Sequence, residues 1–230
     1  RLREELLNRC IHLVDVDLRW GVTSEQDALE VCQETIDECR PRFLCILGGR
    51  YGWTPPGREE SITAQEIRYA VLNRPSPRNY SFFYFRDPQV TDTIPEPAAR
   101  AGLYREFPLP EETSELGLEE ASRRAQRRGE KLAAIKQEVV DAGYVPFIYS
   151  ARWDEAQMRL IDLKVFGDRV YSDLLWSIDD ELGLKASQEL DEFAAENAAM
   201  ESFIRERSVG YVVGTRQNLL QELTAFAEGE

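Results

Sequence analysis

The 230-residue chain has few of the residues that build metal and redox sites. His12 is its only histidine, and none of its four cysteines stands in a C-x-x-C pair. We therefore expect no zinc site made of cysteine and histidine side chains. Unpaired cysteines of this kind fit a reduced, intracellular setting, and the sequence predicts a cytoplasmic protein.

The sequence also lacks long apolar runs and an excess of basic residues. It contains no stretch of about 18 apolar residues and no signal-peptide pattern, so no membrane span is predicted. Its 42 Asp and Glu residues outnumber 28 Lys and Arg residues, which gives a formal net charge of −14. This charge repels phosphate backbones and anionic lipid surfaces, and it argues against nucleic acid and membrane partners.

Short apolar runs alternate with helical patterns along residues 1–182. The runs at 11–18, 43–47, 80–85 and 144–150 predict strands, and the run from Phe43 to Leu47 is apolar throughout, as in a strand buried on both faces. Helices are predicted at about 2–9, 24–40, 61–73 and 165–180, and helical spacing also follows the charged blocks at 115–131. This alternation predicts an α/β fold with a parallel sheet and right-handed crossovers.

Two regions fall outside this alternation. Residues 88–114 carry five prolines and little periodicity, and they predict an irregular insertion. Beyond about residue 183 the chain becomes acidic and helical, which is typical of a linker to another domain. Within the helix predicted at 24–40, Leu29, Cys32, Ile36 and Cys39 form the expected buried stripe.

Charged residues, aromatic residues and glycines directly follow the predicted strands. Arg19 and Trp20 follow the first, the segment Gly48–Trp53 the second, Arg86 the third and Arg152 the fourth. The carboxyl ends of parallel strands share one edge, where ligands of open α/β sheets bind. The residues predicted to form one wall of a ligand pocket at this edge are Arg19, Trp20, Gly48, Gly49, Tyr51, Trp53, Ser61 and Arg86.

These side chains also allow purely structural roles. Arg19 is able to hold a phosphate or to pair with Glu66, and its structural alternative is a pair with Asp17. Trp20 is able to stack on a base or to cover the rim of the pocket. In the same way, Arg86 and Asp87 allow a mutual ion pair. Arg152 and Trp153 are interpreted as residues that only close the edge of the sheet.

Four separated segments carry a resemblance to a known family. Residues 15–21, 48–52, 61–66 and 84–87 resemble the TIR-like N-terminal domain of NACHT/AAA-type (STAND) signalling ATPases, a family that includes telomerase-associated protein, nephrocystin and bacterial defence proteins. The resemblance implies a flavodoxin-like parallel sheet flanked by helices over residues 1–182, followed by a helical linker over 183–230. It also implies self-association and further domains, an NTPase and repeats, in the same longer chain. The family's first strand and a G-x-x-x-x-G-K-[ST] motif are absent, so these parts are expected outside this sequence.

The resemblance extends to a candidate catalytic residue. In TIR domains that cleave NAD, a glutamate follows a serine by five positions, and Ser61 and Glu66 match this spacing. The resemblance implies that Glu66 stabilises the positive charge that develops on the ribose as nicotinamide leaves, with NAD or a related nucleotide as substrate and no permanently bound cofactor. The structural alternative is a helix cap at Ser61 and an early-helix acid at Glu66.

Three functions therefore remain open at the level of sequence. The first is an effector that cleaves NAD or a related nucleotide on oligomerisation. The second is a non-catalytic module for self-assembly, in which Arg19, Trp20 and Trp53 anchor the interface. The third is a nucleotide sensor without turnover.

Overall fold

The computed structural model of the chain describes residues 1–13, 28–73, 80–102, 104–182 and 200–201. The chain divides into two compact units, one of residues 1–22 with 185–230 and the other of residues 23–184. Among its described residues, the first unit contains α1 (Leu2–Leu7). Most of the strand predicted at 11–18, the residues Arg19 and Trp20, and nearly all of the predicted linker lie outside the described residues.

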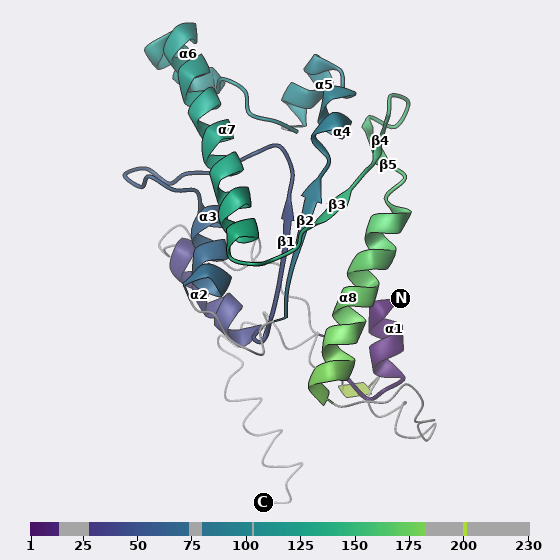
Figure 1. The fold of residues 1–230 in the computed structure, drawn as a ribbon. Helices are drawn as coiled ribbons and strands as arrows, with labels where there is room; N and C mark the ends of the chain where they lie inside the picture. Colours follow the sequence, from purple (N-terminus) through teal and green to yellow (C-terminus); the bar gives the residue numbers. More distant parts are fainter. Residues whose placement is uncertain (14–27, 74–79, 103, 183–199, 202–230) are drawn as a thin grey trace, which may run out of the picture. The chain divides into compact units, whose positions relative to one another are not determined.

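A parallel sheet forms the centre of the larger unit (Figure 1). Its strands β1 (Arg42–Leu47), β2 (Tyr80–Arg86) and β3 (Phe147–Tyr149) stand in the order β1-β2-β3. The register pairs Leu47 with Phe85, and Arg86 with Tyr149. The sheet and its flanking helices confirm the predicted flavodoxin-like α/β class, although β3 is shorter than the run at 144–150 suggested.

Three helices cover one face of the sheet (Figure 1). They are α2 (Ala28–Glu38), α3 (Ile62–Ile67), which continues as the π-helical turn η2 (Arg68–Leu72), and α7 (Leu118–Asp141). The α3 helix begins where the buried Ser61 hydroxyl accepts a hydrogen bond from the Ala64 amide at 3.2 Å. The core beneath these helices consists of Cys45, Leu47, Tyr51, Ala64, Ile67, Ala70, Val71, Phe83, Phe85, Leu132, Ile135 and Val139.

The other face is covered by α8 (Lys164–Leu182) over β2 and β3. Tyr84 packs edge-on against Phe166, and its hydroxyl donates to Asp173 at 2.7 Å. Ile46, on β1, is 50% exposed. The prediction that β1 is buried on both faces is therefore wrong at Ile46. The hydrogen bonds between β1 and α8 are made by Arg42, at the other end of the strand, with Ser177 and Glu181.

Residues 88–114 are not irregular, which corrects the prediction. They contain α4 (Pro88–Asp92), α5 (Glu96–Ala101) and the start of α6 (Pro110–Leu116). Each of these helices has a proline in its first turn, where the missing N–H is not needed, so the prolines start helices instead of preventing them. Together with the hairpin of β4 (Arg152–Asp154) and β5 (Arg159–Ile161), this region forms a second apolar cluster of Ile94, Ala98, Ala99, Phe107 and Trp153.

The prediction of a buried stripe on the helix at 24–40 is only partly correct. Leu29 is buried and Ile36 packs against the core, but α2 ends at Glu38 and Cys39 is exposed. Cys39 lies beyond the last helical turn, so it no longer shares the buried face of Cys32. In the part of the chain that the structure describes, no helix is long and apolar enough to cross a membrane.

Candidate functional site

A buried cation lies where β1 and β2 end. Arg86 is 8% exposed, and its Nη2 donates to the Tyr104 carbonyl at 2.6 Å, while its Nε is buried without a partner. Gly48 makes room for the guanidinium, since a Cβ at this position would lie 3.1 Å from Nη2. The predicted pair with Asp87 does not form: Asp87 instead caps α4 by accepting from the Gln89 amide at 2.9 Å.

A second cation reaches the same place from α7. The Lys136 Nζ donates to the Gly48 carbonyl at 2.8 Å and lies 5.2 Å from the centre of the Phe85 ring. Burial and the positive charge of Arg86 both lower the pKa of Lys136. Among the described residues, neither cation has a carboxylate within ion-pair distance. We call Gly48, Arg86 and Lys136 the cationic cluster.

The segment that follows α5 holds the Gly48–Trp53 loop in place. Gly49 forms a parallel β-bridge with Arg105, and a Cβ at Gly49 would lie only 2.7 Å from the Tyr104 carbonyl oxygen. The Tyr51 amide donates to Glu106 Oε1 at 2.8 Å. Gly49 is thus required for close contact between the two backbones.

An ion-pair network anchors this segment to α7. Arg128 donates to Glu106 Oε2 at 2.8 Å, to Glu112 at 2.8 and 3.1 Å, and to the Phe107 carbonyl at 2.9 Å. The Arg128 side chain is 16% exposed and that of Glu106 is 8% exposed. Because Glu106 binds both Arg128 and the Tyr51 amide, the network connects α7 to the loop beside the cationic cluster.

The contacts of Glu66 do not include residues of the cationic cluster. Its carboxylate accepts a hydrogen bond from the Cys32 thiol of α2, and its charge also acts on Cys45 of β1. Burial and then Glu66 raise the pKa of each of these two thiols to about 12, so both stay protonated at neutral pH and are poor nucleophiles. Among the described residues, Glu66 forms no ion pair.

The remaining predicted site residues lie in three kinds of environment. Ser61 caps α3 and lies close to Gly52, whose φ of 97° requires a glycine. Tyr51 is a core residue, whereas Trp53 is 62% exposed. Arg19 and Trp20 fall outside the described residues, so their roles stay predictions.

Sequence reasoning missed Lys136, Glu106 and Arg128, which all contribute to the site. One signal was available for Arg128. The buried positions of α7 include Ala121, Ala125, Leu132, Ile135 and Val139, and residue 128 falls between them at helical spacing. An arginine on a buried stripe needs a partner, and this predicts an ion pair. Lys136 flanks the same stripe, four residues after Leu132.

No group of His, Cys, Asp and Glu side chains that could hold a metal ion is found among the described residues. The cationic cluster has the opposite chemistry. Guanidinium and ammonium groups without carboxylate partners bind phosphate and carboxylate anions, and arginine does so with two parallel hydrogen bonds. Lys136 is only half-buried, so the cluster is partly exposed on the side of this lysine.

Comparison with known proteins gives a family match and partial relatives. Residues 3–158 match the family model described as "Domain of unknown function (DUF4062)". A TPR repeat-containing protein of Dictyostelium discoideum is 25% identical over 260 aligned positions, which cover 100% of this chain and 14% of that protein. Telomerase protein component 1 of Rattus norvegicus is 33% identical over 109 residues, and that of Mus musculus 32%, each covering 37% of this chain and 4% of that protein. No solved structure matches the chain.

Proposed function

The chain belongs to the DUF4062 family, whose function is unknown, and we propose that it is a signalling module that binds a phosphate-bearing nucleotide. The observation that carries this proposal is the cationic cluster. Arg86 and Lys136 stand together at the carboxyl ends of two parallel strands, where ligands of open α/β sheets bind. Their charges are not balanced by a carboxylate among the described residues, and a phosphate supplies that balance.

We further propose that the module works within longer, STAND-type signalling proteins. The chain spans 14% of the Dictyostelium relative and 4% of the telomerase components, so these relatives carry it as a small part. The four segments that resemble TIR-like domains support an effector role. The name of the Dictyostelium relative records TPR repeats, and this supports a setting of protein–protein assembly.

Glu66 is the proposed catalytic carboxylate of this module, with NAD or a related nucleotide as substrate. It is half-buried and forms no ion pair among the described residues, so its charge is available to a developing ribosyl cation. The cysteines beside it are protonated, which leaves the carboxylate as the reactive group at this position.

Glu66→Gln is expected to abolish NAD consumption while leaving pyrophosphate binding unchanged. The amide keeps the hydrogen bond with Cys32 but cannot stabilise positive charge. NAD loss is measured by chromatography with the chain at high concentration, and Glu130→Gln, an exposed change on α7, is the matched control. Hydrolysis is disproved if the wild-type chain consumes no NAD, and the binding proposal fails as well if neither NAD nor pyrophosphate binds.

A non-catalytic assembly module is the second candidate, and the exposure of Trp53 favours it. A large aromatic side chain that is 62% exposed is a typical interface anchor. Trp53→Ala is then expected to weaken self-association at least about tenfold, the size of a hot-spot loss, in sedimentation experiments. Trp176→Ala is the control, because Trp176 is similarly exposed but packs on Tyr80 of its own chain. Unchanged sedimentation of the Trp53 variant removes this candidate.

A further inference from the structure

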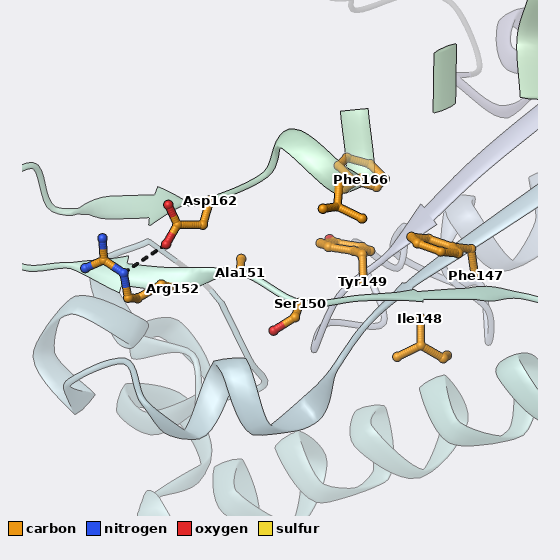
Figure 2. A pocket seen from close by; sticks show the side chains of 9 residues that line it. Phe147, Ile148, Tyr149, Ser150, Ala151, Arg152, Asp162 and Phe166 are labelled. Carbon is orange, nitrogen blue, oxygen red and sulfur yellow. Dashed lines mark hydrogen bonds and ion pairs between the residues drawn. The ribbon is translucent and has the colours of Figure 1, made fainter. Parts of the chain in front are cut away.

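A groove of about 390 Å³ runs along the outer edge of β3 (Figure 2). Residues 147–152 form one wall, and Asp162, Val165 and Phe166 form the other. The volume lies in the range of small-molecule sites, about 300–1,000 Å³. We call this feature the edge groove.

The backbone of β3 offers a donor and an acceptor to the edge groove. The Tyr149 carbonyl accepts from the Asp87 amide at 2.9 Å, so the backbone groups of Tyr149 face β2. In a strand, the backbone groups of successive residues point to opposite edges. The N–H and C=O of Ile148 therefore face the groove, on an edge with which no described strand pairs.

The walls of the groove suit a flat, uncharged group. The rings of Tyr149 and Phe166 stack with centroids 4.3 Å apart and an interplanar angle of 25° (Figure 2). Val165 adds an apolar side chain that is 72% exposed. The charged groups in the lining neutralise each other, since Arg152 Nε donates to Asp162 Oδ2 at 2.9 Å. Aromatic surface without net charge favours a planar ring over a phosphate.

The edge groove adjoins the cationic cluster through Tyr149. This residue lines the groove and is the register partner of Arg86 on the neighbouring strand. Burial raises the pKa of Tyr149, and the positive charge of Arg86 offsets part of the rise, so the Arg86 charge acts on the groove wall. Neighbouring strands lie about 4.8 Å apart, so the backbones of Tyr149 and Arg86 lie about that far from each other.

We infer that the edge groove binds the adenine base of the nucleotide whose phosphates bind the cationic cluster. Adenine carries an amino donor beside a ring-nitrogen acceptor on one edge, and these match the C=O and N–H of Ile148. Its ring is planar and neutral, which suits the exposed apolar side chains of Ile148 and Val165 in the lining of the groove. This inference rests on the proposed function and specifies its ligand class as adenine nucleotides.

Calorimetric titrations of the chain with ADP and with inorganic pyrophosphate test the inference. ADP is expected to bind at least about tenfold more tightly, because only ADP carries the base. Inosine diphosphate, which has a keto oxygen in place of the amino group, is expected to lose most of this advantage. Val165→Trp, which places an indole at the groove wall, is expected to reduce ADP affinity to that of pyrophosphate. The control is Val145→Trp, at a residue that is 94% exposed and outside the groove.

The outcomes separate this inference from the proposed function. Equal affinities for ADP and pyrophosphate overturn the inference and leave phosphate binding intact. Tighter ADP binding that Val165→Trp does not change also overturns it, because the base then lies elsewhere. If neither compound binds, the proposed function fails and the inference fails with it. Circular dichroism and thermal unfolding establish that each variant is folded.

Discussion

Replacement of Arg128 by methionine is expected to lower the free energy of unfolding by about 3 kcal/mol, as for the removal of one partner from a buried ion pair. The change leaves the mostly buried carboxylate of Glu106 without its cation, and it leaves Glu112 with the more distant Arg124 guanidinium at 3.9 Å. It also frees the Phe107 carbonyl, which Arg128 binds at 2.9 Å. Urea unfolding followed by circular dichroism measures the loss.

The matched control is Arg127→Met, one residue earlier on α7. Arg127 is exposed, so its replacement is expected to change the free energy of unfolding by less than about 0.5 kcal/mol. An equal decrease in the free energy of unfolding in both variants would contradict a stabilising role of the Arg128 ion-pair network. A double variant with Glu106→Gln adds a second test, because residues of one ion-pair network do not contribute additively.

Arg128→Met is also expected to disturb the proposed anion site. Glu106 binds both Arg128 and the Tyr51 amide, so loss of Arg128 releases the segment that carries Tyr104. The Tyr104 carbonyl in turn holds the Arg86 guanidinium. Structural support and the proposed anion site therefore share one chain of contacts, which begins at an arginine on the buried stripe of α7.

The apolar pattern predicted most of the central fold. β1 and β2 were predicted because their runs are continuous, and α3 because its buried residues recur at helical spacing. The apolar pattern alone could not predict which helix covers which part of the sheet. β1 has the composition of a strand buried on both faces, yet Ile46 is half-exposed. Burial depends on which helix lies over which strand, and this information is not local.

The candidate site was predicted only in part for the same reason. Gly48, Gly49 and Arg86 were found because strand ends meet at one edge. Lys136 and Glu106 were missed because their partners lie 88 and 55 residues away in the sequence. Charged blocks such as those at 115–131 are typical of a solvated helix, yet the Arg128 side chain in this stretch is only 16% exposed. Tertiary contacts of this range leave no local periodicity.

Arg86→Gln is expected to reduce the affinity for NAD and for pyrophosphate by about 10- to 100-fold, the loss of one charge-assisted hydrogen bond of about 1.5–3 kcal/mol. Glutamine is able to donate to the Tyr104 carbonyl, so the segment that Arg86 holds keeps a donor. Calorimetric titration measures the affinities, and Arg127→Gln, which removes the same charge from an exposed site on α7, is the control. Equal weakening in both variants would mean that net charge, and not the cationic cluster, attracts the anion.

The pH dependence of binding separates the roles of the two cations. The pKa of Lys136 is lowered below the 10.5 of an ordinary lysine, by burial and by the charge of Arg86. Anion affinity in the wild-type chain is therefore expected to fall with rising pH before an ordinary lysine loses its proton. Between the lowered pKa of Lys136 and 10.5, the free energy of unfolding increases slightly, because the folded chain loses this proton at lower pH than the unfolded chain. In Arg86→Gln the charge repulsion between residue 86 and Lys136 is absent, so the pKa of Lys136 rises. The loss of anion affinity then moves to higher pH. Lys136→Arg keeps its charge throughout and is expected to remove the fall altogether. A wild-type profile that stays flat up to pH 10.5 would show that Lys136 does not contact the anion.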